Sequence, residues 1–132
     1  MTPPAVDMVE RVELAPAAAL FRSLGDPGRL AILRRLTDGP ARVVDLVAAV
    51  GLAQSTVSKH LACLRGCGLV VSEPVGRASV FRMAEPSLIE VLAAAEVVLV
   101  STGNAVALCP PGTDTEIEAN FTHGAVESAS EL

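Results

Sequence analysis

Residues 43–65, VVDLVAAVGLAQSTVSKHLACLR, contain two short apolar-patterned segments separated by a glycine. The first segment, 43–50, is helical in its spacing and is followed by Gly51, a residue that suits the left-handed turn after a helix. The second begins near Gln54 and continues to about Arg65. A short helix, a tight glycine turn and a second helix predict a helix-turn-helix unit.

The second helix of this unit is predicted to have two unlike faces. Val57, Leu61 and Leu64 fall on one side at helical spacing and are expected to face the core. The other side carries small or polar side chains and one cation, namely Ser55, Ser58, Lys59 and Ala62. Such a face suits a DNA major groove, where hydroxyls and a lysine contact base edges and phosphates. A merely solvated amphipathic helix is the alternative, and the flanking elements favour the groove.

Other elements are expected on both sides of this unit. Asp26-Pro27 predicts an N-cap and first residue for a helix over 28–36, which Asp38-Gly39-Pro40 ends. Upstream, apolar spacing predicts a first helix, and Pro16 is expected to open a second short one that ends at Leu24. Downstream, 69–71 and 78–81 are β-type segments joined by a turn at 73–76, which predicts a hairpin. A last helix is expected to run from Pro86 to about Val100.

These elements predict a mainly α fold with a β-hairpin wing, a winged helix-turn-helix. We expect three regions: an N-terminal arm and helix over 1–16, the winged helix-turn-helix domain with its last helix over 17–101, and an acidic flexible tail over 102–132 that carries Cys109. Gly, Pro, Ser, Thr and Glu dominate that tail, and such a composition is typical of mobile segments.

The charge is distributed unevenly along the 132 residues. The formal net charge is −5, yet residues 21–82 hold nine Lys and Arg against four Asp and Glu, a net +5. A basic centre between acidic ends suits contact with phosphates, although a globular domain with ordinary surface arginines has the same balance. Arg77, at the expected hairpin tip, can reach a minor groove or a phosphate.

Several classes of protein are disfavoured by the sequence. Aromatic residues make up only 2% of the chain, so base stacking or an aromatic cage is not expected as the main chemistry. No catalytic arrangement of Ser, His and Asp and no glycine-rich phosphate loop is present, so an enzyme is not expected. The apolar region 88–100 is too short and too acidic to span a membrane, and the acidic N-terminus does not resemble a secretory signal. We therefore expect a cytoplasmic protein with reduced cysteines.

The three cysteines form a candidate metal site. Cys63 and Cys67 are one helical turn apart, so their Cβ atoms are expected about 5–6 Å apart, within reach of one ion. A disulfide needs about 3.5–4.5 Å, so it would require the helix end to unwind. Together with Cys109 they suggest a three-thiolate site, which selects a soft ion over calcium or magnesium. Alternatively, Cys63 packs as a small apolar residue and Cys109 is incidental. His60 lies beside the pair, and helix packing or a phosphate contact is favoured over a fourth ligand.

Four segments resemble the ArsR/SmtB family of winged-helix, metal-responsive repressors. They are LGDPGRLAIL (24–33), QSTVSKHL (54–61), GLV (68–70) and the wing return over 76–83, within a likeness that covers about 17–100. The resemblance implies a homodimer formed through the first and last helices, which binds operator double-stranded DNA and is released by an inducer. It assigns DNA binding to Gln54, Ser55, Thr56, Ser58, Lys59, His60 and Arg77. Ala53 departs from the Ser or Thr cap of many relatives, a loss worth about 1 kcal/mol.

The segment LACLRGCGLVV (61–71) is similar to that of the cadmium- and lead-sensing type of this family. That likeness implies that Cys63, Cys67 and Cys109 bind Cd(II) or Pb(II), with the tail cysteine supplied by the other subunit. No cysteine adjoins Arg29 and no histidine occurs in 86–100, so the arsenic and the zinc or nickel sites of other members are absent. An arsenite- or antimonite-responsive repressor, a thiol redox sensor and a protein-interaction module without DNA remain as alternatives.

Overall fold

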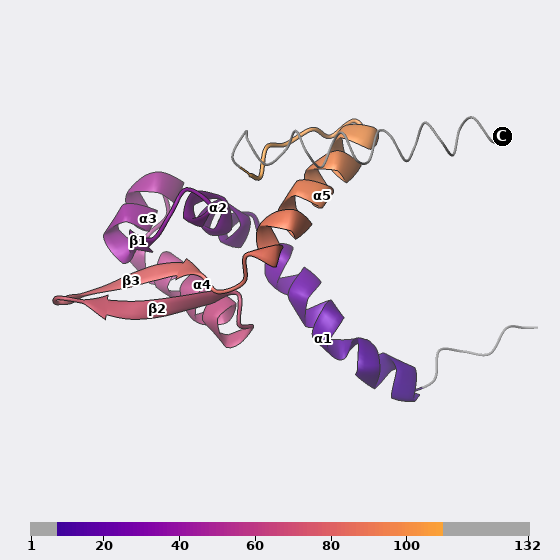
Figure 1. Ribbon diagram of the computed structural model, residues 1–132, viewed down its shortest axis with the longest axis horizontal. Coiled ribbons are helices and arrows are strands. Elements are labelled where there is room, and N and C mark those ends of the chain that lie inside the picture. Colours follow the sequence, from indigo (N-terminus) through magenta and orange to yellow (C-terminus); the bar gives the residue numbers. More distant parts are fainter. Residues whose placement is uncertain (1–7, 110–132) are drawn as a thin grey trace, which may run out of the picture.

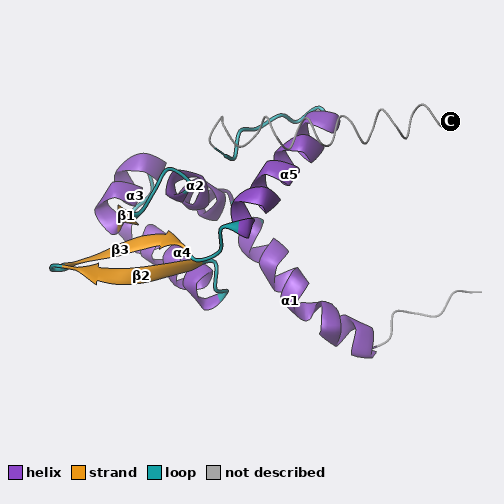
Figure 2. Cartoon of the chain, viewed as in Figure 1, coloured by secondary structure: helices purple, strands orange, loops and turns teal. Residues whose placement is uncertain are grey.

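The computed structural model describes residues 8–109 of the chain. Five helices and three strands follow one another in these residues (Figures 1 and 2). They are α1 (Met8–Leu24), α2 (Pro27–Leu36), β1 (Ala41–Arg42), α3 (Val43–Val50), α4 (Gln54–Gly66), β2 (Val70–Val75), β3 (Ala78–Met83) and α5 (Ser87–Ser101). The winged helix-turn-helix fold predicted from the sequence is confirmed, with α3 and α4 as its helical pair and β2–β3 as its wing.

The core lies where α2, α3 and α4 meet the sheet. The strands are antiparallel in the order β1–β3–β2, and Phe81 of β3 lies opposite Ala41 on one side and Ser72 on the other. Apolar side chains of these helices and of the sheet fill this core. Those that are completely buried are Ile32, Leu33, Leu46, Val57 and Leu64. Burial of this set holds α4 in place and leaves its opposite face outward.

The helix ends form as their residues predict. Asp26 caps α2, because its Oδ2 accepts the backbone N–H of Arg29 at 3.0 Å, and Pro27 follows at the first helical position. Gly51 ends α3 at φ 70°. At the end of α4, Gly68 has φ 76° and the N–H of Leu69 donates to the carbonyl of Leu64 at 2.9 Å. This Schellman arrangement fixes where α4 stops and the wing begins.

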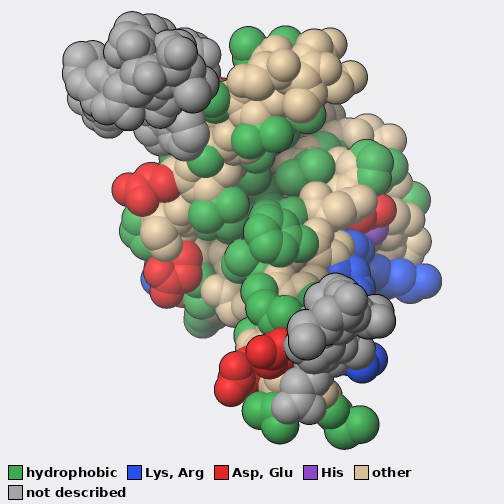
Figure 3. Space-filling model, turned by 90° about the vertical axis from the view of Figure 1, so that its right-hand side faces the viewer, with side chains coloured by type: hydrophobic (Ala, Val, Ile, Leu, Met, Phe, Trp, Pro, Cys, Tyr) green, Lys and Arg blue, Asp and Glu red, His purple; other side chains and the backbone are tan. Residues whose placement is uncertain are grey.

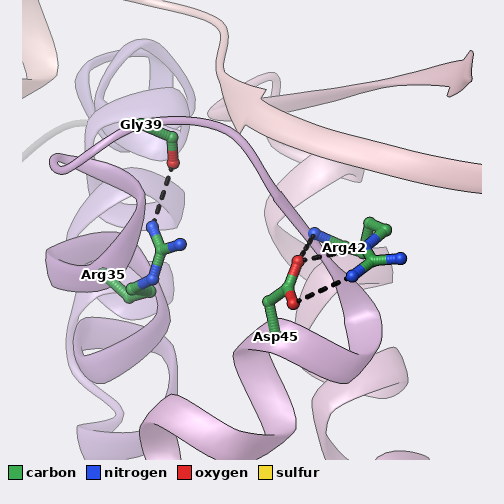
Figure 4. A network of polar contacts seen from close by, with 4 residues as sticks. All are labelled: Arg35, Gly39, Arg42 and Asp45. Atoms are coloured by element: carbon green, nitrogen blue, oxygen red, sulfur yellow. Dashed lines mark hydrogen bonds and ion pairs between the residues drawn. The ribbon is translucent and has the colours of Figure 1, made fainter.

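Polar contacts within two pairs of residues hold the connection from α2 to α3 (Figure 4). Arg35 donates to the carbonyl oxygen of Gly39 at 3.2 Å, and Asp45 accepts from both the backbone and the guanidinium of Arg42. The backbone N–H of Arg42, with its side chain beside it, holds the pKa of Asp45 below its usual value. These contacts fix Arg42 as the N-cap of α3, so the helix begins at Val43.

The structure corrects three expectations about the elements. A single helix, α1, runs through Pro16 where we predicted two. Proline costs one backbone hydrogen bond but has a helical φ, so it does not by itself have to start a new helix. The two-residue strand β1 was not predicted, because so short a segment has no periodicity. The hairpin turn is at Gly76-Arg77 rather than 73–76, since β2 continues through Pro74, which an edge strand tolerates.

The first part of the expected mobile tail is packed against the domain. The N–H of Asn104 donates to the carbonyl of Leu99 at 2.7 Å, and the chain then turns back beside α5. Leu108 and Cys109 are both 8% exposed. Leu108 is apolar and joins the core cluster, which explains why this segment is not loose. The rest of the expected tail, 110–132, lies outside the described residues, as does the start of the expected N-terminal arm.

Helices α1 and α5 extend from the body on the side away from the hairpin tip (Figure 1). Large apolar side chains are exposed on both, including Val12 (67%), Phe21 (65%) and Val98 (58%). Among the described helices none is both long and apolar enough to cross a membrane.

Candidate DNA-binding surface and cysteine sites

The face of α4 predicted to meet DNA points outward. Gln54, Ser55, Ser58 and Lys59 are exposed, while Thr56 and His60 are half-buried. The predicted inward face is confirmed by the burial of Val57, Leu61 and Leu64. Ala53 occupies the N-cap with extended backbone and makes no side-chain cap bond, as its residue type predicts.

The wing presents one cation at its tip. Arg77 is exposed within the two-residue turn between β2 and β3. Arg82, further along β3, forms an ion pair with Glu73, in which the Nη2 atom of Arg82 is 2.9 Å from Oε1 of Glu73. The wing therefore offers Arg77 to a phosphate or groove, and Arg82 serves the hairpin itself.

His60 holds α4 against α2. Its Nε2 is 3.3 Å from Oδ2 of Asp26, and a Cβ added at Gly28 would lie 2.6 Å from the same nitrogen. The pKa of Asp26 lies below its usual value, first because its carboxylate accepts the N–H of Arg29 and also because the imidazole of His60 lies beside it. The contacts of His60 show that it positions α4. A contribution of His60 to DNA binding remains a prediction.

The two α4 cysteines lie at the end of the helix, where the sequence places them. The N–H of Cys67 donates to the carbonyl of Cys63 at 3.1 Å, so the helical turn continues through Cys67. Both side chains are exposed. The i, i+4 relation and the exposure are what a shared ion requires of two thiolates.

Cys67 also has a neighbour from a distant part of the chain. Its sulfur is 2.9 Å from the hydroxyl oxygen of Ser23, the penultimate residue of α1, which is only 3% exposed. The guanidinium of Arg29 donates to the carbonyl oxygens of Ser23, at 2.7 Å, and Arg22, at 2.9 Å. We call Ser23, Asp26 and Arg29 the α1–α2 corner.

Cys109 is held beside α5 of its own chain. Its sulfur donates to the carbonyl of Ile89 at 3.4 Å. Its backbone N–H donates to Oε1 of Glu96 at 2.6 Å, and the N–H of Leu108 donates to the same oxygen. Arg34 adds a bond to the carbonyl of Ala107 at 3.3 Å. The segment before Cys109 is thus anchored from both α5 and α2.

Glu96, which holds the segment that carries Cys109, was not among the predicted site residues. It is 8% exposed, and its carboxylate is satisfied by two backbone N–H groups of the returning segment. A signal was present: Leu88 and Leu92 precede it at four-residue spacing, so Glu96 falls on the buried stripe of α5. A carboxylate on such a stripe requires an internal donor.

The three cysteines do not meet within one chain. Over residues 8–109, no three side chains of His, Cys, Asp or Glu are grouped closely enough to hold one ion. A three-thiolate site therefore needs either a second chain or movement of the segment that carries Cys109.

An apolar groove lies between α1 and α5. Its volume is about 600 Å³, and apolar side chains gather over this face of the molecule (Figure 3). Side chains from both helices and from the returning segment line it, among them Phe21, Leu24, Val91, Val98 and Leu108.

Sequence comparisons find related regulators. Residues 26–72 match the family described as "Bacterial regulatory protein, arsR family". The HTH-type transcriptional regulator CmtR of Mycobacterium tuberculosis is 47% identical over 75 residues, which cover 57% of this chain and 64% of CmtR. The match thus spans just under two thirds of that relative. The uncharacterised HTH-type regulator Rv0081 of the same organism is 36% identical over 83 residues, or 62% of this chain and 73% of Rv0081.

Solved structures agree with the sequence matches. The crystal structure of Rv0081 superposes with a TM-score of 0.64 at 31% identity, covering 73% of this chain and 93% of that one. The homodimeric winged helix-turn-helix DNA-binding domain Mb0332 of Mycobacterium bovis gives 0.63 at 26% identity, covering 74% and 89%.

Proposed function

Because this chain belongs to the arsR family of bacterial transcriptional regulators, a family of DNA-binding proteins and not of enzymes, we propose that it is a metal-responsive repressor. It binds operator DNA as a homodimer and is released when Cd(II) or Pb(II) binds Cys63, Cys67 and Cys109. The observation that carries this proposal is the exposed cysteine pair at the end of the helix that also presents the DNA-binding face. Because its proposed target is chromosomal DNA, the protein is expected to act in the cytoplasm.

DNA contact is assigned to α4 and the wing tip. The exposed hydroxyls and Lys59 of α4 enter a major groove, and Arg77 contacts a phosphate or the neighbouring minor groove. The net +5 of residues 21–82 supplies the non-specific attraction that the whole-chain charge conceals.

A second copy of the chain is assigned to the α1–α5 face. Both helices leave apolar side chains exposed beside the groove between them, and a twofold dimer would bury this same surface of both subunits. The homodimeric description of the related Mb0332 domain supports this arrangement. Dimerisation sets two copies of α4 about one DNA turn apart, so the operator is palindromic.

The dimer also explains how Cys109 joins the site. Within one chain it lies against α5, away from the α4 pair, but α5 is the helix assigned to the partner. Cys109 is therefore near the neighbouring subunit, and the likeness to the cadmium- and lead-sensing type supports a site that two subunits share. Binding deprotonates the thiols, so the apparent metal affinity rises with pH.

The ion and the operator act on each other through α4. An ion that joins the end of α4 to the segment around Cys109 restrains that helix and lowers the affinity for DNA. By linkage, the operator weakens ion binding by the same factor, and such couplings are typically about 1–3 kcal/mol.

The test is an ultraviolet titration of the reduced protein with cadmium, following the thiolate-to-metal charge-transfer band. The chain has three cysteines in all, so every thiolate in the band comes from them. We expect saturation at one ion per chain, with weakening by each of Cys63→Ser, Cys67→Ser and Cys109→Ser. No tight band, or a band indifferent to Cys109→Ser, contradicts the proposal. Stronger competition from arsenite, or loss of two hydrogens per chain in mild peroxide, would favour the arsenite and redox alternatives.

Subunit mixing distinguishes a shared site from one within a chain. Cys109→Ser subunits are mixed with subunits that carry both Cys63→Ser and Cys67→Ser. Neither parent has a complete set, yet a mixed dimer regains one complete set only when the site spans two subunits. Recovery of the cadmium band on mixing supports the shared site, and its continued absence contradicts it.

A further inference from the structure

Ser23 is a buried polar residue that the proposed repressor mechanism does not use. It is 3% exposed, and its hydroxyl is 2.9 Å from the sulfur of Cys67, which lies 44 positions later. A buried hydroxyl needs a hydrogen-bond partner. Here the partner is the sulfur of a proposed metal ligand, and the bond joins the end of α1 to the end of α4.

The surroundings of Ser23 make this a fixed connection. The last carbonyl groups of a helix have no partner within the helix. In α1, two of them are satisfied by the guanidinium of Arg29, whose own backbone N–H is held by Asp26. Asp26 also contacts His60 of α4. The α1–α2 corner is therefore bonded to α4 at two points, at His60 and at Cys67.

We infer that Ser23 is the positioning residue for Cys67 and that it carries the effect of a bound ion to α1. The inference rests on the proposed function, in which Cys67 is a ligand. A hydroxyl that donates to a metal-bound thiolate orients the sulfur and tunes its bond to the metal. The Ser23 hydroxyl is already in place to do this before the ion arrives.

The connection to α1 gives the bond a consequence for DNA binding. Helix α1 carries exposed apolar residues assigned to the partner subunit, such as Val12 and Phe21. A change at the α1–α2 corner therefore alters how α1 sits against α4 in each subunit. Because two copies of α4 must match the spacing of two half-sites, a small rotation lowers operator affinity.

The contact itself is tested without metal, by a double-mutant cycle in the full-length protein. Ser23→Ala, Cys67→Ala and the double variant are compared by urea unfolding, with Ser101→Ala, an exposed serine at the end of α5, as control. We expect the double variant to unfold at nearly the same urea midpoint as the less stable of the two single variants, because either change alone removes the hydrogen bond. Midpoint shifts that simply add would overturn the inference.

The relay is tested with cadmium and operator DNA. In Ser23→Ala we expect one ion per chain still to bind, with the charge-transfer band moved to longer wavelength, since the sulfur has lost a hydrogen-bond donor. The fold-loss of operator affinity on adding cadmium should shrink at least threefold relative to wild type. Ser101→Ala should match wild type in both readouts.

The outcomes separate this inference from the proposed function. If wild type loses its operator on adding cadmium and Ser23→Ala does so equally, the relay is wrong and the repressor mechanism stands. If the wild-type protein binds cadmium yet keeps its operator, the proposed function fails and the relay fails with it. A Ser23→Ala band at the wild-type wavelength would overturn the role of Ser23 as the partner of the bound sulfur.

Discussion

Gly28 and His60 show how one close contact helps to hold α4, the proposed DNA-binding helix, against α2. A Cβ at position 28 would lie 2.6 Å from the Nε2 of His60, so any larger residue there would force the ring to shift. Helix α2 therefore accepts a residue of low helical propensity in its first turn. The close approach holds α4 against the cap of α2.

Gly28→Ala should destabilise the protein by about 1–3 kcal/mol, because the ring must shift and loses Asp26. In a His60→Ala background the clash with the ring is absent and only the approach to Oδ2 of Asp26, at 3.1 Å, remains. The same substitution should then be clearly less destabilising, because helix propensity favours alanine by about 0.5–1 kcal/mol. Urea unfolding of the four proteins measures both effects. Destabilisation of equal size in both backgrounds would contradict this account of the glycine.

Asp26 gives the fold an acid-sensitive point. Its pKa is lowered in the folded protein, chiefly by the N–H of Arg29, so its stabilising contribution is present above the unfolded pKa of about 4. That contribution is lost as the pH falls through the lowered folded pKa. We expect Asp26→Asn to be less stable than wild type at pH 5, with the gap closing toward pH 3. A gap that stays constant in urea melts over this range would show that Asp26 is not responsible.

At the scale of the element, α4 begins without a side-chain cap. Ala53 has the extended backbone of an N-cap, φ −62° and ψ 148°, but offers no acceptor to the first N–H groups of the helix. Helix α4, the proposed DNA-binding helix, is therefore held by its buried face, its end at Gly68 and its contacts with the α1–α2 corner.

Ala53→Ser should raise the free energy of unfolding by about 0.5–2 kcal/mol, since it supplies the missing acceptor. Ala48→Ser, at an exposed position inside α3, is the matched control and should be neutral or slightly destabilising. Chemical denaturation reports both. Equal shifts for the two variants would mean that position 53 does not act as a cap.

The elements with local signals were predictable, and those that depend on distant packing were not. Asp26-Pro27 and Gly51 mark helix boundaries by their own chemistry, and the structure has them there. Strand β1 exists only because β3 pairs with it, and two residues carry no pattern. The continuity of α1 through Pro16 was also not predicted, because proline is typical of the first turn of a new helix.

The candidate site shows the same division. The spacing of Cys63 and Cys67 predicted a pair on one helical turn, and their exposure agrees. The contact between Ser23 and Cys67 was not predictable, because these residues are 44 positions apart and their approach depends on how the chain packs between them. Glu96 had a signal in its place on the buried stripe of α5, but its partners come from a segment that we expected to be loose.

At the scale of the whole molecule, the proposed repressor is a dimer of two chains. The described part of one chain leaves apolar side chains exposed on α1 and α5 and does not bring three thiols together. One proposed arrangement, a dimer through α1 and α5, accounts for both observations. It buries the exposed apolar side chains and brings the third thiol to the other two. It also sets the spacing of the two DNA-binding helices.

Val98→Glu should raise the dimer dissociation constant at least about tenfold, because it places a charge on each side of an apolar interface. Val44→Glu is a closely matched control, since Val44 on α3 is exposed to the same extent, 58%. Sedimentation equilibrium compares the two. Equal dissociation constants for Val98→Glu and wild type would place the interface elsewhere.

The most direct test of the repressor mechanism is operator binding by the reduced full-length protein, with and without cadmium. Wild type and Cys63→Ser, Cys67→Ser and Cys109→Ser are compared at one fixed salt concentration. We predict that all four bind the operator without metal, and that cadmium weakens wild-type binding by about 5- to 150-fold but leaves the three variants bound. Release of Cys109→Ser to the same extent as wild type, or no release of wild type, would contradict the account.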